Sequence, residues 1–146
     1  MSNRHSILIV ADHASNFIPD EYNNLDLSKE LVESHIAYDI GVKQLSLKLS
    51  EKLKSHLVMG CYSRLLIDLN RGIMDPTLIS SISHGIKIIK NYRLSSRDKN
   101  FRINEVYNNY HDRIYRIIKR EKINLIISLH SFNPYYKKKR RNIKFG

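Results

Sequence analysis

The chain has a single cysteine and no long apolar segment. Cys61 has no partner for an internal disulfide, which fits a reducing compartment. No apolar run approaches the roughly 20 residues that a membrane-spanning helix needs. Residues 1–5 are polar and lack the apolar segment of a signal peptide. We therefore expect no membrane association and a cytoplasmic location.

Glycine and proline are also scarce, with 5 and 3 residues in a chain of 146. This scarcity argues against disorder and low complexity, and no internal repeat is visible. Hydrophobic residues make up 42% of the chain and charged residues 27%, as in ordinary globular proteins. Length and composition together predict one domain over residues 1–146.

Acidic residues are few, 14 against 25 basic ones, so the formal net charge is +11. Such an excess can attract a polyanion such as nucleic acid, or can follow from a base composition that enriches Lys, Asn and Ile. The one dense basic run is Lys137-Lys138-Lys139-Arg140-Arg141, and no recognised nucleic-acid motif surrounds it. We expect nucleic acid not to be the main partner, and polyanion binding through this run is an alternative.

Polar clusters follow three apolar runs that are typical of strands. They are Asp12-His13 after residues 7–11, Asp68-Leu69-Asn70-Arg71 after residues 65–67, and His130-Ser131 after residues 125–129. In a parallel α/β sheet the carboxyl ends of the strands face one edge, where ligands bind. We therefore expect the side chains of His13, Arg64, Arg71 and His130 to converge on one cleft. Two histidines, carboxylates and an arginine are the composition of a metal-assisted hydrolase site with an anion anchor.

The hydrophobic pattern predicts strands separated by helices. Strands are expected over residues 6–11, 57–62 and 123–129, and residues 64–69 are expected to form a third strand or a continuation of the second. Helices are expected from about residue 29 to Leu53, interrupted or bent at Gly41, and over residues 103–120. Apolar residues repeat at helical spacing in both helices: Val42, Leu45, Leu49 and Leu53 in the first, and Val106, Tyr107, Tyr110, Ile114, Ile117 and Ile118 on one face of the second. Residues 72–100 are expected to form a long loop with short elements. Strands joined through helices imply crossover connections and an α/β fold with a mainly parallel sheet.

The histidines and two aspartates each have a structural alternative. Asp12 and His13 can bind or orient a metal ion, or can belong to a turn beside an exposed histidine. His130 can be a ligand or a structural residue at the end of a strand. Asp39 can be a site residue or can mark the end of a helix.

The cluster around Asp68 also has two interpretations. Arg64 and Asp68 lie an even number of residues apart and would share one face of a strand. Arg64 or Arg71 can bind a carboxylate through two hydrogen bonds, and Asn70 can add a donor. Alternatively, Asp68 forms a salt bridge with an arginine and fastens the loop, and both interpretations can hold together.

Taken together, these segments resemble the N-formylglutamate amidohydrolase family. The matching stretches are residues 12–16 with 18–19, 35–41, 62–71, 110–111 and 130–134, followed by Arg140-Arg141. They occur in the same order and run through nearly the whole chain. The most specific one is the Ser-Arg-Leu-x-x-Asp-Leu-Asn-Arg block within residues 62–71.

The resemblance implies a fold and an activity. The family looks related to zinc carboxypeptidases and aspartoacylase-like deacylases, which implies a three-layer α/β/α fold with a mainly parallel or mixed, phosphorylase/hydrolase-like sheet. It also implies zinc as cofactor. The implied reaction is hydrolysis of a linear amide C–N bond in a small-molecule N-acyl amino acid such as N-formyl-L-glutamate.

The resemblance also suggests roles for individual residues. His13 and His130 match the histidine zinc ligands. Asn70 and Arg71 match the pair that holds the substrate carboxylate. Arg64 is a candidate to polarise the scissile carbonyl, since a cation there would stabilise the developing oxyanion.

The third metal ligand stays open. Related carboxypeptidases have a glutamate ligand three residues after the first histidine, where this chain has Asn16. Asp12 and Asp39 are the alternatives, and Asp39 is in addition a candidate catalytic residue. Ser131, next to the second histidine, is a candidate substrate contact.

Members of the family continue beyond the position that matches Gly146, into further strands and the glutamate that acts as general base. We therefore expect an incomplete domain with an exposed apolar sheet edge and weak zinc binding. We also expect slow or absent turnover by the chain alone, because a missing base costs about 10²–10⁴ in rate. A complementary C-terminal fragment is then an expected partner. The alternative function is a non-catalytic binding module that retains the carboxylate pocket.

Overall fold

A computed structural model describes residues 6–132 and the backbone of residues 135–136 and 139–140. Residues 1–5 and the side chains of the basic run at 137–141 lie outside the described residues, so the expectations on them are not tested. Within the described part, no helix is long and apolar enough to cross a bilayer.

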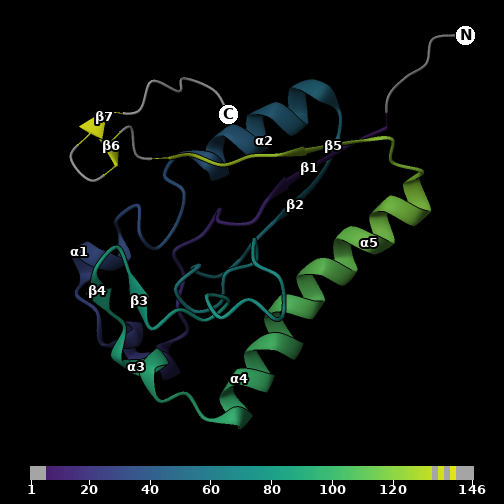
Figure 1. Ribbon diagram of the computed structural model, residues 1–146. Helices are drawn as coiled ribbons and strands as arrows, with labels where there is room; N and C mark the ends of the chain where they lie inside the picture. Colours follow the sequence, from purple (N-terminus) through teal and green to yellow (C-terminus); the bar gives the residue numbers. More distant parts are fainter. Residues whose placement is uncertain (1–5, 133–134, 137–138, 141–146) are drawn as a thin grey trace, which may run out of the picture.

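Three parallel strands form the centre of the molecule (Figure 1). β1 (Ile7–Ala11) lies between β2 (His56–Met59) and β5 (Leu125–Ser128). Val10 lies opposite Val58 on one side and Ser128 on the other. Residues 8–11 of β1 are buried, which explains why this strand is apolar throughout. The predicted α/β class with a mainly parallel sheet is confirmed.

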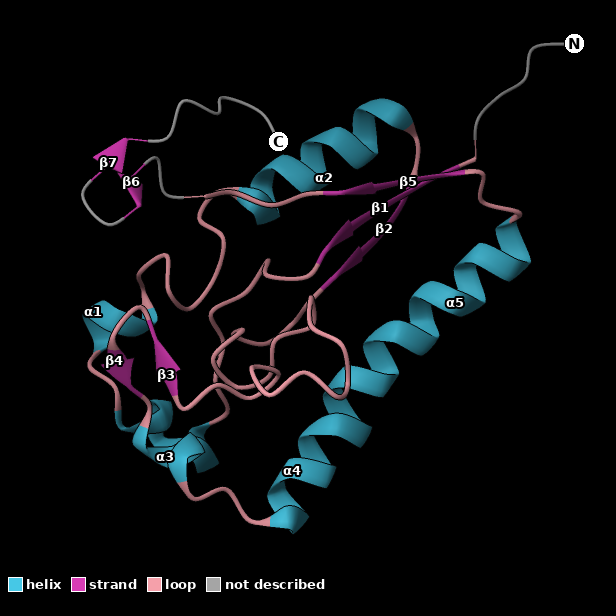
Figure 2. Cartoon of the chain, in the orientation of Figure 1, coloured by secondary structure: helices cyan, strands magenta, loops and turns pink. Residues whose placement is uncertain are grey.

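Helices cover both faces of this sheet (Figure 2). Ala11 packs with Val42 of α2 (Val42–Leu53), whereas Val10 packs with Tyr110 of α5 (Asn109–Glu121). Neighbouring residues of a strand point to opposite faces, so α2 and α5 lie on opposite sides of β1. This arrangement gives the three layers expected of the fold.

Shorter elements complete the described chain. They are η1 (Asp20–Asp26), α1 (Lys29–Val32), β3 (Ile82–Ser83), β4 (Ile86–Lys87), α3 (Ile89–Tyr92), α4 (Ser96–Arg102), η2 (Ile103–Asn108), β6 (Tyr135–Tyr136) and β7 (Lys139–Arg140). β3 pairs with β4 and β6 with β7 as antiparallel hairpins. Residues 72–100, predicted as a long loop with short elements, therefore contain one hairpin and two short helices.

The predicted helix over residues 103–120 forms part of a longer helical stretch. α4, the π-helical turn η2 and α5 follow one another without a break. The predicted apolar face packs on the sheet as expected; its members are Val106, Tyr107, Tyr110, Ile114, Ile117 and Ile118. The 3.6-residue period therefore identified the buried face of this helix correctly.

The predicted helix from residue 29 to Leu53 is two separate helices. α1 ends at Val32, and α2 begins after Gly41, whose φ of 82° lies in the left-handed region. Within α2, Ser46 is buried, whereas Leu45 is 51% exposed. The predicted stripe containing Leu45 is therefore wrong, because Val42 and Ser46, one turn apart, form the buried face.

The expected strand over residues 64–69 is also wrong. These residues form turns, such as the one closed by the Leu66 amide donating to the Ser63 carbonyl at 2.9 Å. Leu65 and Leu66 are buried in a second apolar cluster below the loops, with Leu25 and Ile88. A short apolar run shows burial but does not distinguish a strand from a buried turn.

β5 is an edge strand in the described part of the chain. It pairs with β1 alone. Leu125 is 42% exposed and Ile126 is 49% exposed, and these neighbouring side chains point to opposite faces. Within the described residues this edge therefore exposes apolar side chains.

Gly60 brings the end of β2 against the end of β1. Its amide donates to the Ala11 carbonyl at 2.9 Å. A β-carbon at position 60 would overlap the backbone carbonyl of Asp12 and would lie 2.8 Å from a methyl group of Leu69. Only glycine therefore allows the backbone to approach Asp12 this closely.

We expect Gly60→Ala to lower the free energy of unfolding by about 1–3 kcal/mol, because the new methyl group forces the backbone at Asp12 to move. Urea denaturation would measure the change. The matched control is Gly72→Ala, since a β-carbon at position 72 has no atom within 4 Å. Equal losses in the two variants would contradict the steric explanation.

Candidate functional site

Histidines and carboxylates from distant parts of the chain meet at the carboxyl ends of β1 and β5. Asp12 and His13 directly follow β1, and His130 lies two residues beyond β5. Asp39 comes from the loop before α2, and its backbone amide donates to the His13 carbonyl at 2.9 Å. The site therefore forms where parallel α/β sheets usually bind ligands.

The two histidine rings lie next to each other, with centroids 5.2 Å apart. Nε2 of His13 lies 2.7 Å from Oδ1 of Asp68, and Nε2 of His130 lies 3.3 Å from Oδ2 of Asp12. Each ring thus has one carboxylate at Nε2. This contact orients the ring and leaves Nδ1 directed elsewhere.

Both Nδ1 atoms face the carboxylate of Asp39. Oδ2 of Asp39 lies 2.9 Å from Nδ1 of His130 and 3.6 Å from Nδ1 of His13. The His13 side chain is only 2% exposed, and its buried Nδ1 has no hydrogen-bond partner within the described part of the chain. One ligand atom from each of His13, Asp39 and His130 lies within 4.8 Å of the others, so these residues fit a metal ion.

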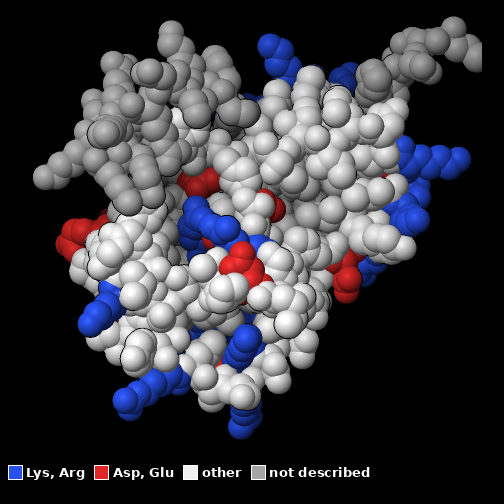
Figure 3. Space-filling view, viewed as in Figure 1, with Lys and Arg blue, Asp and Glu red and all other residues white. Residues whose placement is uncertain are grey.

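Arg64 links Asp39 and Asp68 from the solvent side. Its Nη2 donates to Oδ2 of Asp68 at 2.9 Å, and its Nη1 lies 3.7 Å from Oδ1 of Asp39. The Arg64 side chain is 28% exposed, so part of the guanidinium remains accessible. In Figure 3, acidic and basic side chains lie next to one another near the centre of the face shown.

Arg71 lies further out than Arg64. Its Nε is 3.8 Å from Oδ2 of Asp68, its Nη1 is 4.0 Å from Oδ2 of Asp75, and its side chain is 47% exposed. The Asn70 amide donates to Oδ1 of Asp68 at 3.0 Å. The predicted salt bridge between Asp68 and an arginine is therefore present and fastens residues 64–71. The Arg71 side chain nevertheless remains accessible to an anion.

The protonation of the site follows from these contacts. Hydrogen bonds to Asp12 and Asp39 raise the pKa of His130 to about 9, against the effect of burial. Burial alone would raise the pKa of Asp39, but hydrogen bonds from His13 and His130 outweigh it and hold that pKa well below its usual range. Burial opposes ionisation of Asp68 too, and its contacts with His13 and Arg64 lower the pKa to about 2. The carboxylates are therefore charged at neutral pH.

Two of the residues predicted for the site make other contacts. The Asn16 amide nitrogen donates to the Val32 carbonyl at 3.1 Å, so the structure holds this side chain toward α1. Ser131 contacts the site through its backbone amide, which donates to Oδ2 of Asp39 at 3.2 Å. The geometry therefore favours Asp39, which is one of the alternatives given by the sequence, over Asn16 as a third metal ligand.

Two residues of the site were not assigned a site role from the sequence. Asp68 was placed in a polar cluster at this edge, but the only specific role given to it was that of a salt-bridge partner, although it also holds His13. Tyr110 was assigned to the core, but its hydroxyl donates to Oδ1 of Asp12 at 2.6 Å. The available signals were the spacing of Asp68 from Arg64 and the position of Tyr110 in a stretch that resembles the family.

The fold and the site define a three-layer α/β protein with histidines and carboxylates gathered at the carboxyl edge of its parallel sheet. The sequence matches the family model of N-formylglutamate amidohydrolase over residues 5–146, and the chain belongs to this family. A comparison with curated proteins gave no significant match.

The fold is similar to a solved structure, the crystal structure of gene product Atu2144 from Agrobacterium tumefaciens. The two sequences are 32% identical, and the TM-score is 0.91. The match covers 95% of this chain and 57% of that chain. The chain thus spans less than two-thirds of the length of this relative.

We expect the metal-free protein to lose stability as the pH rises through 9. The pKa of His130 is raised from 6.5 to about 9 in the folded protein. The stabilisation is therefore complete below pH 6.5 and disappears as the ring loses its proton. Urea denaturation between pH 6 and 9.5, with a chelator present, would measure this change in the free energy of unfolding.

His130→Gln should flatten this pH dependence, and His56→Gln, at the opposite end of the sheet, serves as the control. A slope that persists in His130→Gln would show that another group is responsible.

Proposed function

We propose that the protein contributes the metal site and the carboxylate anchor of an amidohydrolase that acts on N-acyl amino acids such as N-formyl-L-glutamate. The observation that carries this proposal is the buried Nδ1 of His13, which faces Asp39 and has no hydrogen-bond partner among the residues that the structure describes. Membership of the family supports this reaction over polyanion binding and over a purely non-catalytic module.

His13, Asp39 and His130 would hold the metal through two imidazole nitrogens and one carboxylate oxygen. Zinc suits such a donor set, and three protein ligands leave a position open for water or substrate. When bound, the metal lowers the pKa of a water ligand and polarises the amide carbonyl. Asp68 and Asp12 would keep the two rings in the orientation that this requires.

Arg64 and Arg71 would act on the substrate. Arg64 contacts Asp39 and Asp68 and would supply a fixed positive charge for the developing oxyanion. Arg71, which is more exposed, would hold the substrate carboxylate together with Asn70. Fixing the carboxylate would orient the scissile bond toward His13, Asp39 and His130, which we call the metal group. Such positioning is a large part of catalysis.

Three carboxylates of the described site are candidates to accept a proton from water. Asp12 contacts His130 and Tyr110, Asp39 contacts both histidines, and Asp68 contacts His13. Each of these three carboxylates is thus already engaged by neighbouring groups. Slow turnover by this chain alone therefore stays a prediction.

We expect His13→Ala and His130→Ala to weaken Co²⁺ binding by more than about 100-fold, because each removes a ligand nitrogen. Asp68→Asn should have a smaller effect, about 10–100-fold, since it only loosens the ring of His13. Titration followed by the visible spectrum of Co²⁺ would measure this series. His56→Ala is the control, and unchanged binding in the first two variants would exclude the metal site.

We expect Arg71→Ala to weaken binding of N-formyl-L-glutamate by about 10- to 100-fold, which is the loss of one charged hydrogen-bonding partner. Calorimetry measures this binding whether or not turnover occurs, and formate release measures KM and kcat where it does. Arg97→Ala, on the exposed side of α4, is the matched control. Wild-type affinity in Arg71→Ala would show that the carboxylate binds elsewhere.

A further inference from the structure

The segment that carries Arg64 and Asp68 is not part of the sheet. Residues 64–69 form turns, although Leu65, Leu66 and Ile67 are buried. A buried turn has carbonyl groups that no neighbouring strand satisfies. Something else must fix the backbone between the two site residues.

Two buried side chains bind the carbonyl groups of this turn. Nδ2 of Asn91 donates to the Leu65 carbonyl at 2.8 Å, and Nη1 of Arg102 donates to the Leu66 carbonyl at 2.9 Å. Nη1 of Arg102 also donates to Oδ1 of Asn91 at 2.8 Å. Asn91 and Arg102 thus form one connected clamp on consecutive carbonyl groups.

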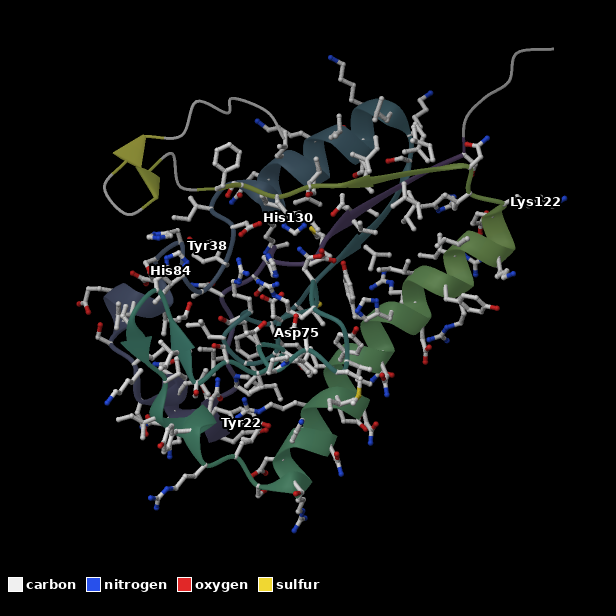
Figure 4. All side chains as sticks on the ribbon, in the orientation of Figure 1. Tyr22, Tyr38, Asp75, His84, Lys122 and His130 are labelled. Atoms are coloured by element: carbon white, nitrogen blue, oxygen red, sulfur yellow. The ribbon has the colours of Figure 1, made fainter. Side chains whose placement is uncertain are left out.

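The clamp joins the turn to two other parts of the chain. Nδ2 of Asn91 also donates to the Ser80 carbonyl at 2.9 Å, next to the β3–β4 hairpin. The Arg102 guanidinium lies over the ring of Tyr22, 4.6 Å from its centroid, and Figure 4 shows Tyr22 between α3 and α4. The clamp therefore connects the turn to Ser80 and to Tyr22 of η1.

Arg102 is an unusual residue for a core position. It is 1% exposed, and burial lowers the pKa of its guanidinium. Among the ion pairs of the described residues, none joins Arg102 to a carboxylate at salt-bridge distance. A buried charge without such a partner is unfavourable for stability, and an apolar side chain of similar size would avoid this penalty. Its five fixed donors, in contrast, suit the positioning of backbone carbonyls.

We propose that Arg102 and Asn91 are positioning residues that hold Arg64 and Asp68 in place against His13 and Asp39. The inference rests on the proposed function of this site, since it assigns the clamp to the geometry of the metal group. Asp68 holds Nε2 of His13, so a shift of the turn would release this ring from its orientation.

The test compares Arg102→Met, which removes all donors, with Arg102→Lys, which keeps the charge and a donor. Hydrogen exchange is measured in the metal-free protein at the Asp68 amide, which donates to the Leu78 carbonyl at 2.8 Å. We expect exchange there to be on the order of tenfold faster in Arg102→Met, with the amide of Val10 in β1 unchanged. Arg102→Lys should restore part of the protection.

Co²⁺ affinity is the second measurement on the same variants. We expect Arg102→Met to bind Co²⁺ about tenfold more weakly, as for losses of groups that orient metal ligands. The matched control is Ile118→Ala on α5, which removes packing in another apolar cluster. It should lower the melting temperature and leave both the Asp68 exchange and the Co²⁺ affinity unchanged.

Wild-type exchange at Asp68 in folded Arg102→Met would overturn the proposal. If Arg102→Met does not fold, Asn91→Asp decides by the same exchange measurement, since it keeps the acceptor for Arg102 and loses both Nδ2 hydrogen bonds. If the wild-type protein binds no Co²⁺, the metal part of the proposed function fails, and the exchange data alone decide whether the clamp positions the turn.

Discussion

The carboxylate of Asp39 is the contact on which the rest of the site depends. Its Oδ2 lies between the Nδ1 atoms of His13 and His130, and it also accepts the Ser131 amide. Its Oδ1 faces Arg64 at 3.7 Å. One side chain thus joins the residues that follow β1, those that follow β5, and the turn before Asp68. Without it, two histidines would face each other with no shared anion.

The surrounding carboxylates balance the positive charge of this cluster. Asp68 lies between His13 and Arg64, and Asp12 lies between His130 and Tyr110. Several of these groups are buried, so each would be unfavourable alone. The arrangement is stable because neighbours of opposite charge satisfy each other, and this mutual dependence also fixes the direction of each imidazole ring. The protein's own contacts thus fix the directions of the ring nitrogens.

Much of the fold could be predicted from local patterns. The apolar run of β1 and the face of α5 from Val106 to Ile118 were correct, because continuous burial and the helical period are visible in a single stretch of sequence. The same method failed at residues 64–69, because Leu65 and Leu66 are buried in a cluster with Leu25 and Ile88 and not in the sheet. It also placed Leu45 in the core, although the helix turns Val42 and Ser46 inward.

The sequence by itself determined which residue types are available to the site, and so the kind of chemistry: His13, Asp39, Arg64 and His130 were all named from it. Only the tertiary structure decided how they are connected. The choice of Asp39 as the shared carboxylate, the pairing of Asp68 with His13, and the clamp of Asn91 and Arg102 all join residues far apart in the chain. Such contacts depend on how strands and loops pack in three dimensions, which no local period or spacing encodes.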